Sequence, residues 1–131
     1  MRLNGLNCIV TGGSSGIGAA TVKRFINEGA EVLIADIDID SANSLADELG
    51  PAVGAIKCDV RLETDIKAVA DHAYNRWKKV DVLVNNAGSE LNQTYDKTTL
   101  EEWDRILDTD LKGPWLMCKH IVPGMVKTGS G

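Results

Sequence analysis

The chain has 131 residues, 44% of them hydrophobic, and a formal net charge of −5 at pH 7. This length fits one domain with a real hydrophobic core, and the composition is that of a soluble globular protein. The acidic balance argues against binding to nucleic acid or to an anionic membrane surface. The N-terminal residues lack the apolar run of a signal peptide, and no stretch approaches the roughly 18 apolar residues of a membrane span.

The three cysteines, Cys8, Cys58 and Cys118, are far apart and lie in apolar runs. This pattern favours buried, reduced thiols over disulfides and predicts a cytoplasmic protein. His72 and His120 do not complete a metal-ligand spacing with them, so we expect no metal site.

Short apolar strands alternate with amphipathic helical patterns along the chain. We expect strands over residues 8–11, 31–35, 53–58 and 82–84. Gly18, Val22 and Phe25 share one face of the first helix, where the missing side chain of Gly18 allows close approach to the sheet. The last element is predicted as one long helix from Thr99 to about Val126, starting with a capping box. Strands alternating with helices predict an α/β fold with a parallel sheet, covered by helices on both faces.

A glycine-rich turn, Thr11–Gly18, joins the first strand to the first helix. The free N–H groups and the dipole at a helix N-terminus bind phosphate groups, and glycines let a diphosphate approach the backbone. No Lys-Ser or Lys-Thr follows the last glycine, so this is not a Walker A loop. The turn predicts a dinucleotide site, and an ordinary structural turn is the alternative.

Asp36 closes the second strand, where a carboxylate can accept both hydroxyls of an adenosine ribose and would repel a 2′-phosphate. Neither Ser15 nor Ile37 supplies a basic side chain for such a phosphate. NAD is therefore expected in preference to NADP. The alternative is a solvated loop acid, because two more aspartates follow within four residues.

Polar residues also follow the next two strands. Asp59 and Val60 can meet an adenine with a carboxylate at its edge and a methyl group on its face. In the segment Asn85-Asn86-Ala87-Gly88, the small residues admit a ligand and the amides can tie neighbouring strands together. A simple turn is the alternative for this segment.

These motifs together resemble the short-chain dehydrogenase/reductase family over essentially the whole chain. The turn matches the family's TGxxxGxG pattern, and Asp36, Asp59-Val60 and the NNAG segment stand at the family's positions. The resemblance implies a Rossmann-type sheet and hydride transfer between NAD and an alcohol or carbonyl. It also implies cofactor contacts from residues at all four strand ends: Gly12, Ser14, Ser15, Gly16, Ile17, Gly18, Asp36, Ile37, Asp59, Val60, Asn86, Ala87 and Gly88.

Catalysis in this family uses an asparagine, a serine, a tyrosine and a lysine. Asp110 stands at the asparagine position, and the serine and the Tyr-x-x-x-Lys motif are expected beyond Gly131. Residues 1–131 are thus expected to be the NAD-binding domain of such an enzyme, incomplete before strand five and unable to catalyse alone. Pro114 offers no N–H to the Asp110 carbonyl, which could still hold a water of the proton relay if the missing half were supplied. A sequence variant without function is the alternative for Asp110.

The family sheet has the strand order 3-2-1-4-5-6-7, of which this chain would supply 3-2-1-4. Strand 82–84 would then be an exposed apolar edge. The long helix, which builds a subunit interface in related enzymes, would expose Trp115, Met117 and Ile121. We therefore expect self-association, as a homo-oligomer. The expected ligands are a dinucleotide and, only with the missing half, a small alcohol or carbonyl substrate.

Two alternatives stay open. One is a non-enzymatic module that binds NAD or ADP-ribose without chemistry. The other is a methyltransferase, which can also pair a glycine turn with an acid after strand two. The NNAG segment and the TGxxxGxG spacing disfavour the second.

Overall fold

Four parallel strands form the centre of the fold. In the computed structural model, which describes residues 1–131, they are β1 (Asn7–Thr11), β2 (Glu31–Asp36), β3 (Val53–Lys57) and β4 (Val82–Val84). They pair in the order β3-β2-β1-β4, which confirms the predicted topology. Val10 lies beside Ile34 on one side and Val84 on the other, so the carboxyl ends of the strands meet at one edge of the sheet.

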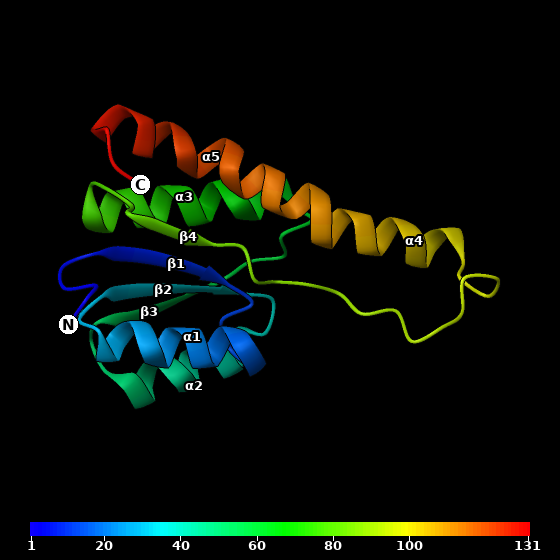
Figure 1. Ribbon diagram of the computed structural model, residues 1–131, viewed down its shortest axis with the longest axis horizontal. Helices are drawn as coiled ribbons and strands as arrows, with labels where there is room; N and C mark the ends of the chain where they lie inside the picture. Colours follow the sequence, from blue (N-terminus) through cyan, green and yellow to red (C-terminus); the bar gives the residue numbers. More distant parts are fainter.

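Helices cover both faces of this sheet (Figure 1). On one face lie α1 (Gly16–Asn27) and α2 (Ile39–Leu49), and on the other lie α3 (Glu63–Trp77) and α5 (Gly113–Thr128). Strand side chains alternate between the faces: Val10 packs toward α1 and α2, whereas Ile9 packs toward α3 and α5. Both faces are covered, so β1 and β2 are buried along almost their whole length.

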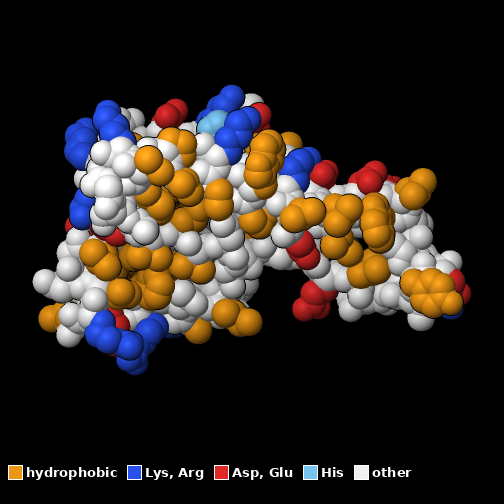
Figure 2. Space-filling view, turned by 45° about the horizontal axis from the view of Figure 1, so that its top comes forward, with side chains coloured by type: hydrophobic (Ala, Val, Ile, Leu, Met, Phe, Trp, Pro, Cys, Tyr) orange, Lys and Arg blue, Asp and Glu red, His pale blue; other side chains and the backbone are white.

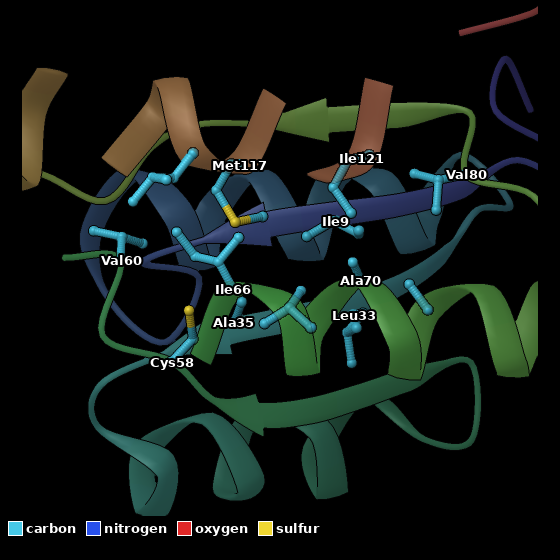
Figure 3. Close-up of a cluster of buried hydrophobic side chains, with 13 residues drawn as sticks. Ile9, Leu33, Ala35, Cys58, Val60, Ile66, Ala70, Val80, Met117 and Ile121 are labelled. Carbon is cyan, nitrogen blue, oxygen red and sulfur yellow. The ribbon is translucent and has the colours of Figure 1, made fainter. Parts of the chain in front are cut away.

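The core between the sheet and the helices α3 and α5 is continuous (Figure 3). Ile9 and Leu33 from the sheet meet Ile66 of α3 and Met117 and Ile121 of α5. Met117 and Ile121 are fully buried, so the prediction that they would be exposed is wrong. Helix α5 packs lengthwise against α3, and these two helices together cover this face of the sheet.

The helix predicted over residues 99–126 is divided into three parts. These are α4 (Leu100–Leu107), a π-helical turn η1 (Asp108–Lys112) and α5. The N–H of Gly113 donates to the carbonyl of Asp108, five residues earlier. Pro114 follows directly and has no N–H to continue an α-helical ladder, which explains the change of register at this point. The capping box of Thr99 and Glu102 is confirmed.

Helix α4 and the irregular segment before it project from the body of the molecule (Figure 1). No residue of α4 is buried. Strand β4 lies at the edge of the sheet, and its three residues are half-buried. Cys8 and Cys58 are buried as predicted, but Cys118 is exposed because it lies on the outer side of α5. No helix combines the length and the apolar character that a membrane crossing requires.

Candidate functional site

A cavity of about 780 Å³ runs along the carboxyl ends of all four strands and reaches the segment that leads to α4. It therefore lies at the edge where the sequence places its polar and glycine-rich motifs. Its lining residues are Gly12, Ser15, Gly16, Ile17, Ala35, Asp36, Ile37, Cys58, Asp59, Val60, Arg61, Asn86, Ala87, Gly88, Ser89, Glu90, Arg105, Thr109 and Asp110.

The glycine turn is shaped by close backbone contacts. Gly12 and Gly16 have φ angles of +62° and +50°, in the left-handed region that favours glycine. A Cβ atom on Gly18 would collide with the carbonyl oxygen of Gly12 and would lie 2.6 Å from Nδ2 of Asn86. Gly18 therefore lets α1 start directly against the ends of β1 and β4, as the sequence predicts.

The N-terminus of α1 is open toward the cavity. Ser15 is the N-cap residue, yet its side chain makes no capping hydrogen bond. The N–H groups of Gly16, Ile17 and Gly18 have no acceptor in the chain, and a Cβ atom on Gly16 would meet no atom within 4 Å. Unpaired donors, a positive dipole end and open space are what a phosphate group needs.

Asp36 is held rigidly at the end of β2. Its Oδ2 accepts the N–H of Ser14 at 2.9 Å, and its Oδ1 accepts the N–H of Asp38 at 3.0 Å. The residue is only 7% exposed, which excludes the alternative of a solvated loop acid. A carboxylate has about four acceptor positions, so two of them have no partner in the chain, and Asp36 lines the cavity.

Asp59 is paired with a residue that the sequence reasoning missed. The guanidinium of Arg61 donates to both carboxylate oxygens, with Nη2 at 2.6 Å from Oδ2 and Nε at 2.9 Å from Oδ1. The hydrogen bonds from the Arg61 side chain hold the pKa of the Asp59 carboxyl below its usual range. An arginine two residues after a strand-end aspartate is the signal that could have revealed this pair.

Asn86 ties β4 to β1, as predicted for the amides of this segment. Its Nδ2 donates to the carbonyls of Thr11 and Gly12, both at 3.0 Å. The hydroxyl oxygen of Thr11, whose role the sequence reasoning did not foresee, accepts the N–H groups of Asn86 and Ala87. This network excludes the simple-turn alternative. Asn85 instead contacts Sγ of Cys118, at 3.7 Å.

A second polar group closes the β4 end of the cavity. Oδ1 of Asp110, in η1, accepts the N–H of Ser89 at 2.8 Å. Arg105 of α4 donates to the hydroxyl of Ser89 and to the carbonyl of Glu90. Four more lining residues escaped the sequence analysis: Ser89 and Glu90, which lie in a segment without a periodic pattern, and Arg105 and Thr109, which lie in the predicted long helix and carry no motif.

The structure brings most of the predicted site residues together. Among the predicted cofactor contacts, only Ser14 and Gly18 do not line the cavity. Ser14 donates its N–H to the carboxylate of Asp36, which does line the cavity. Gly18 packs against the carbonyl of Gly12. Asp110 lines the cavity at its β4 end. The cofactor contacts themselves stay predictions.

One Tyr-x-x-x-Lys spacing occurs within the chain, at Tyr74 and Lys78, and the sequence analysis overlooked it. The Tyr74 hydroxyl donates to the carbonyl of Ile121 at 2.6 Å, and Lys78 ends α3 in the left-handed conformation. Neither residue lines the cavity. Tyr74 therefore joins α3 to α5 and is not a candidate for catalysis.

Comparison with known proteins identifies the family of the chain. The family model for short chain dehydrogenases matches residues 7–131. Momilactone A synthase of Oryza sativa subsp. japonica is 41% identical over 133 residues, covering 99% of this chain and 48% of that protein. The 3-oxoacyl-[acyl-carrier-protein] reductase FabG of Thermotoga maritima is 37% identical over 134 residues, covering 100% of this chain and 54% of that protein.

A solved structure of 3-ketoacyl-(acyl-carrier-protein) reductase from Brucella melitensis, complexed with NADH, superimposes with a TM-score of 0.94 at 37% identity. The match covers 97% of this chain and 53% of that chain. The chain thus spans about half the length of the relatives that it matches. A family match over nearly all of its residues, with the predicted sheet order, shows that the chain belongs to the short-chain dehydrogenase family.

Proposed function

We propose that the cavity binds NAD and that residues 1–131 are the cofactor-binding domain of an oxidoreductase. The reaction would transfer a hydride between NAD and an alcohol or carbonyl. The observation that carries this proposal is the open N-terminus of α1, which faces the same cavity as the carboxylate of Asp36. The related reductase from Brucella melitensis, solved with NADH, supports it.

The residues present fit such a ligand. The free N–H groups of the first turn of α1 suit a diphosphate, and the two remaining acceptor positions of Asp36 suit the hydroxyls of a ribose. Ile37, which is 58% exposed, and Val60 offer apolar surface to a base. At the other end, Ala87 and Gly88 leave room for a nicotinamide. Bound NAD would supply the site that accepts or returns the hydride.

We further propose that the site prefers NAD to NADP. Four carboxylates and two guanidinium groups line the cavity, so an additional phosphate dianion would enter a surplus of negative charge. Asp36 is the carboxylate closest in sequence to the glycine turn and is bound to it through Ser14. A 2′-phosphate beside Asp36 would meet like charge in a partly desolvated position.

The catalytic step would require residues outside this chain. We place Asp110 at the position of the family asparagine, where its carbonyl, in the π-helical turn before Pro114, would hold a water molecule. In a longer chain that carries the serine, tyrosine and lysine, Asp110→Asn should change turnover by less than tenfold. A larger gain would show that the carboxylate itself impairs the relay.

The chain is also proposed to associate with itself. An apolar stripe runs along α4, η1 and the start of α5, formed by Leu100, Trp103, Leu107, Leu111 and Trp115. These side chains are between 40% and 83% exposed. Figure 2 shows hydrophobic side chains gathered along the part of the molecule that projects from its body, which contains α4. A contiguous exposed apolar surface is typical of a protein interface.

Calorimetric titration with NADH, NADPH and S-adenosylmethionine tests the binding proposal. We expect NADH to bind more tightly than NADPH and S-adenosylmethionine not to bind. Gly16→Val should weaken NADH binding, since a side chain would fill the open space before α1. Gly50→Val is the matched control, because Gly50 also has a positive φ and open surroundings but lies outside the cavity.

Two outcomes of this titration would contradict the proposal. Absence of NADH binding would overturn it, and tight binding of S-adenosylmethionine would favour the methyltransferase alternative. An assay of alcohol-dependent reduction of NAD, in a chain that includes the catalytic residues, separates the enzyme from the binding module. Binding without any turnover there would support the module.

A further inference from the structure

Arg105 differs from every other arginine of the chain in having no carboxylate partner. The other four each form an ion pair with an aspartate or a glutamate; they are Arg2, Arg24, Arg61 and Arg76. Arg105 instead donates to two uncharged oxygens. Its Nη1 donates to the hydroxyl of Ser89, and its Nη2 donates to the carbonyl of Glu90 at 3.2 Å. Its positive charge is therefore not neutralised by a direct contact.

The acidic residues around Arg105 have other partners or none. Glu102, one turn earlier on α4, accepts hydrogen bonds within the capping box of that helix. Asp110 accepts a backbone N–H from the segment that follows β4. Glu90 is exposed, and only its backbone carbonyl contacts Arg105. The guanidinium is thus held in place by neutral groups and keeps its charge available.

Several hydrogen-bond donors stay free at this point. A guanidinium carries five N–H donors, and Arg105 uses one on each Nη, so three remain. The hydroxyl oxygen of Ser89 accepts from Arg105, while its own hydrogen has no acceptor in the chain. Both residues line the cavity. The β4 end of the cavity therefore offers a ligand a positive charge together with unused donors.

A carboxylate is the group that suits this arrangement. The planar fork of an arginine can donate to both oxygens of a carboxylate, and such charge-assisted hydrogen bonds are stronger than neutral ones. Asp110 and Glu90 line the same end of the cavity, so a single negative charge fits better than the two charges of a phosphate group. Ala87 and Gly88, where we propose the nicotinamide to lie, directly precede Ser89 in the chain.

We propose that Arg105, together with Ser89, binds a carboxylate of the substrate, so that the alcohol or carbonyl compound is a monocarboxylic hydroxy or oxo acid. This inference rests on the proposed oxidoreductase function and names the substrate class of the same cavity. Arg105 binds and orients the substrate and takes no part in the transfer of the hydride or the proton.

The test measures the binding of three small alcohols to the intact chain by ligand-observed NMR, with and without NAD. The probes are lactate, propane-1,2-diol and 1-aminopropan-2-ol, which differ only in the group beside the secondary alcohol: a carboxylate, a neutral hydroxymethyl group or a cationic aminomethyl group. We expect lactate to bind roughly tenfold more tightly than the diol, as one charge-assisted contact implies. The amino alcohol should bind most weakly.

Three results with the wild type would overturn the proposal. They are the absence of lactate binding, a preference for lactate over the diol below about threefold, and tightest binding of the amino alcohol. The last result would mean that the carboxylates of Asp110 and Glu90 dominate this end of the cavity.

Variants test whether Arg105 carries the preference. Arg105→Gln keeps N–H donors without the charge and should reduce the preference for lactate to about twofold or less. If this variant fails to fold, as judged by circular dichroism, Ser89→Ala replaces it and should lower the preference by at least about twofold. Arg24→Gln is the matched control, because Arg24 lies outside the cavity. An equal loss of preference in Arg24→Gln would indicate general attraction of anions and would contradict the proposal.

Titration of the same proteins with NADH tells failure of this inference apart from failure of the proposed function. If the wild type binds NADH and does not prefer lactate, only the role of Arg105 is wrong. If it prefers lactate through Arg105 and does not bind NADH, the proposed function is wrong and the carboxylate contact stands. If Arg105→Gln weakens NADH binding and leaves the preference for lactate unchanged, Arg105 contacts the cofactor and the proposal is wrong.

Discussion

The glycine turn has no room for a side chain at position 18. The space that a Cβ atom on Gly18 would need is already occupied by the carbonyl of Gly12 and the amide of Asn86. Both groups belong to the junction of β1 and β4. A Cβ atom at position 18 could therefore be accommodated only if the backbone moved or the Asn86 hydrogen bonds broke.

We predict that Gly18→Ala lowers the free energy of unfolding by roughly 2 kcal/mol or more, measured by urea denaturation. Gly16→Ala is the matched control: its side chain would enter open space, so only the strain of a φ of +50° applies, about 1 kcal/mol. An equal loss in the free energy of unfolding for the two variants would contradict the steric explanation.

In the proposed function, Asp36 is the residue on which a preference for NAD over NADP would depend. Asp36→Asn removes the charge and keeps an oxygen that can accept one of the two N–H groups now bound. We predict that the affinity for NADPH relative to NADH rises roughly tenfold in calorimetry, since like-charge repulsion is lost. An unchanged ratio would contradict this role.

Lys57 is paired with Asp36 in the register of β2 and β3 and is one basic residue that could receive the phosphate in that variant. If it does, adding Lys57→Ala to Asp36→Asn should reverse part of the rise in the affinity for NADPH relative to NADH. The single Lys57→Ala variant, tested with NADH, is the control for a general loss of binding.

At the scale of whole elements, α3 and α5 are joined by one carboxylate. Oε1 of Glu63, the first residue of α3, accepts from Nζ of Lys119 at 2.9 Å and contacts Nε2 of His120 at 2.8 Å. The hydrogen bond from Lys119, followed by that from His120, lowers the pKa of Glu63 to about 2, from an ordinary value of 4.5. The folded state therefore favours the charged carboxylate.

A carboxyl whose pKa is lowered on folding stabilises the protein above its unfolded pKa. We predict that the stability difference between the wild type and Glu63→Gln is fully present above about pH 4.5 and disappears as the pH falls toward 2. Urea midpoints measured between pH 2 and pH 6 check this. Asp71→Asn, which removes an exposed carboxylate from the middle of α3 that has no ion pair, should show no such window. A constant difference for Glu63→Gln would contradict the linkage.

For the molecule as a whole, the apolar surface that stays exposed predicts that the chain associates with itself. The core on both faces of the sheet is closed, whereas the apolar stripe on α4, η1 and α5 has no partner within the chain. We predict that the wild type sediments as a dimer or larger species at micromolar concentration in analytical ultracentrifugation. A monomer under these conditions would refute the prediction.

The double variant Leu111→Glu/Trp115→Glu tests whether the stripe is the surface involved. It should shift the protein to a monomer, because two charges would be buried in an apolar contact. Tyr95→Ser is the control, since Tyr95 is highly exposed but outside the stripe. If the double variant associates like the wild type, another surface, such as the edge of β4, is responsible.

Local sequence signals were enough for much of this structure. The four strands and first three helices follow from apolar periodicity, and the start of α4 follows from the Thr99–Glu102 capping box. The positions of Gly12, Asp36, Asp59 and Asn86 at one edge follow from strand ends in a parallel sheet. Such signals act within a few residues, so they can be identified without the fold.

The sequence by itself thus determined the order of the elements, the position of the glycine-rich turn and the family. The tertiary structure decided which surfaces are buried, as at Met117 and Ile121, and how far the last helix runs before its π turn. It alone decided that the Asp59 carboxylate is paired with Arg61, and that the Tyr-x-x-x-Lys spacing at Tyr74 is structural. The physical reason is that periodicity and backbone sterics are local, whereas burial and hydrogen-bond partners depend on neighbours that only the folded chain brings together.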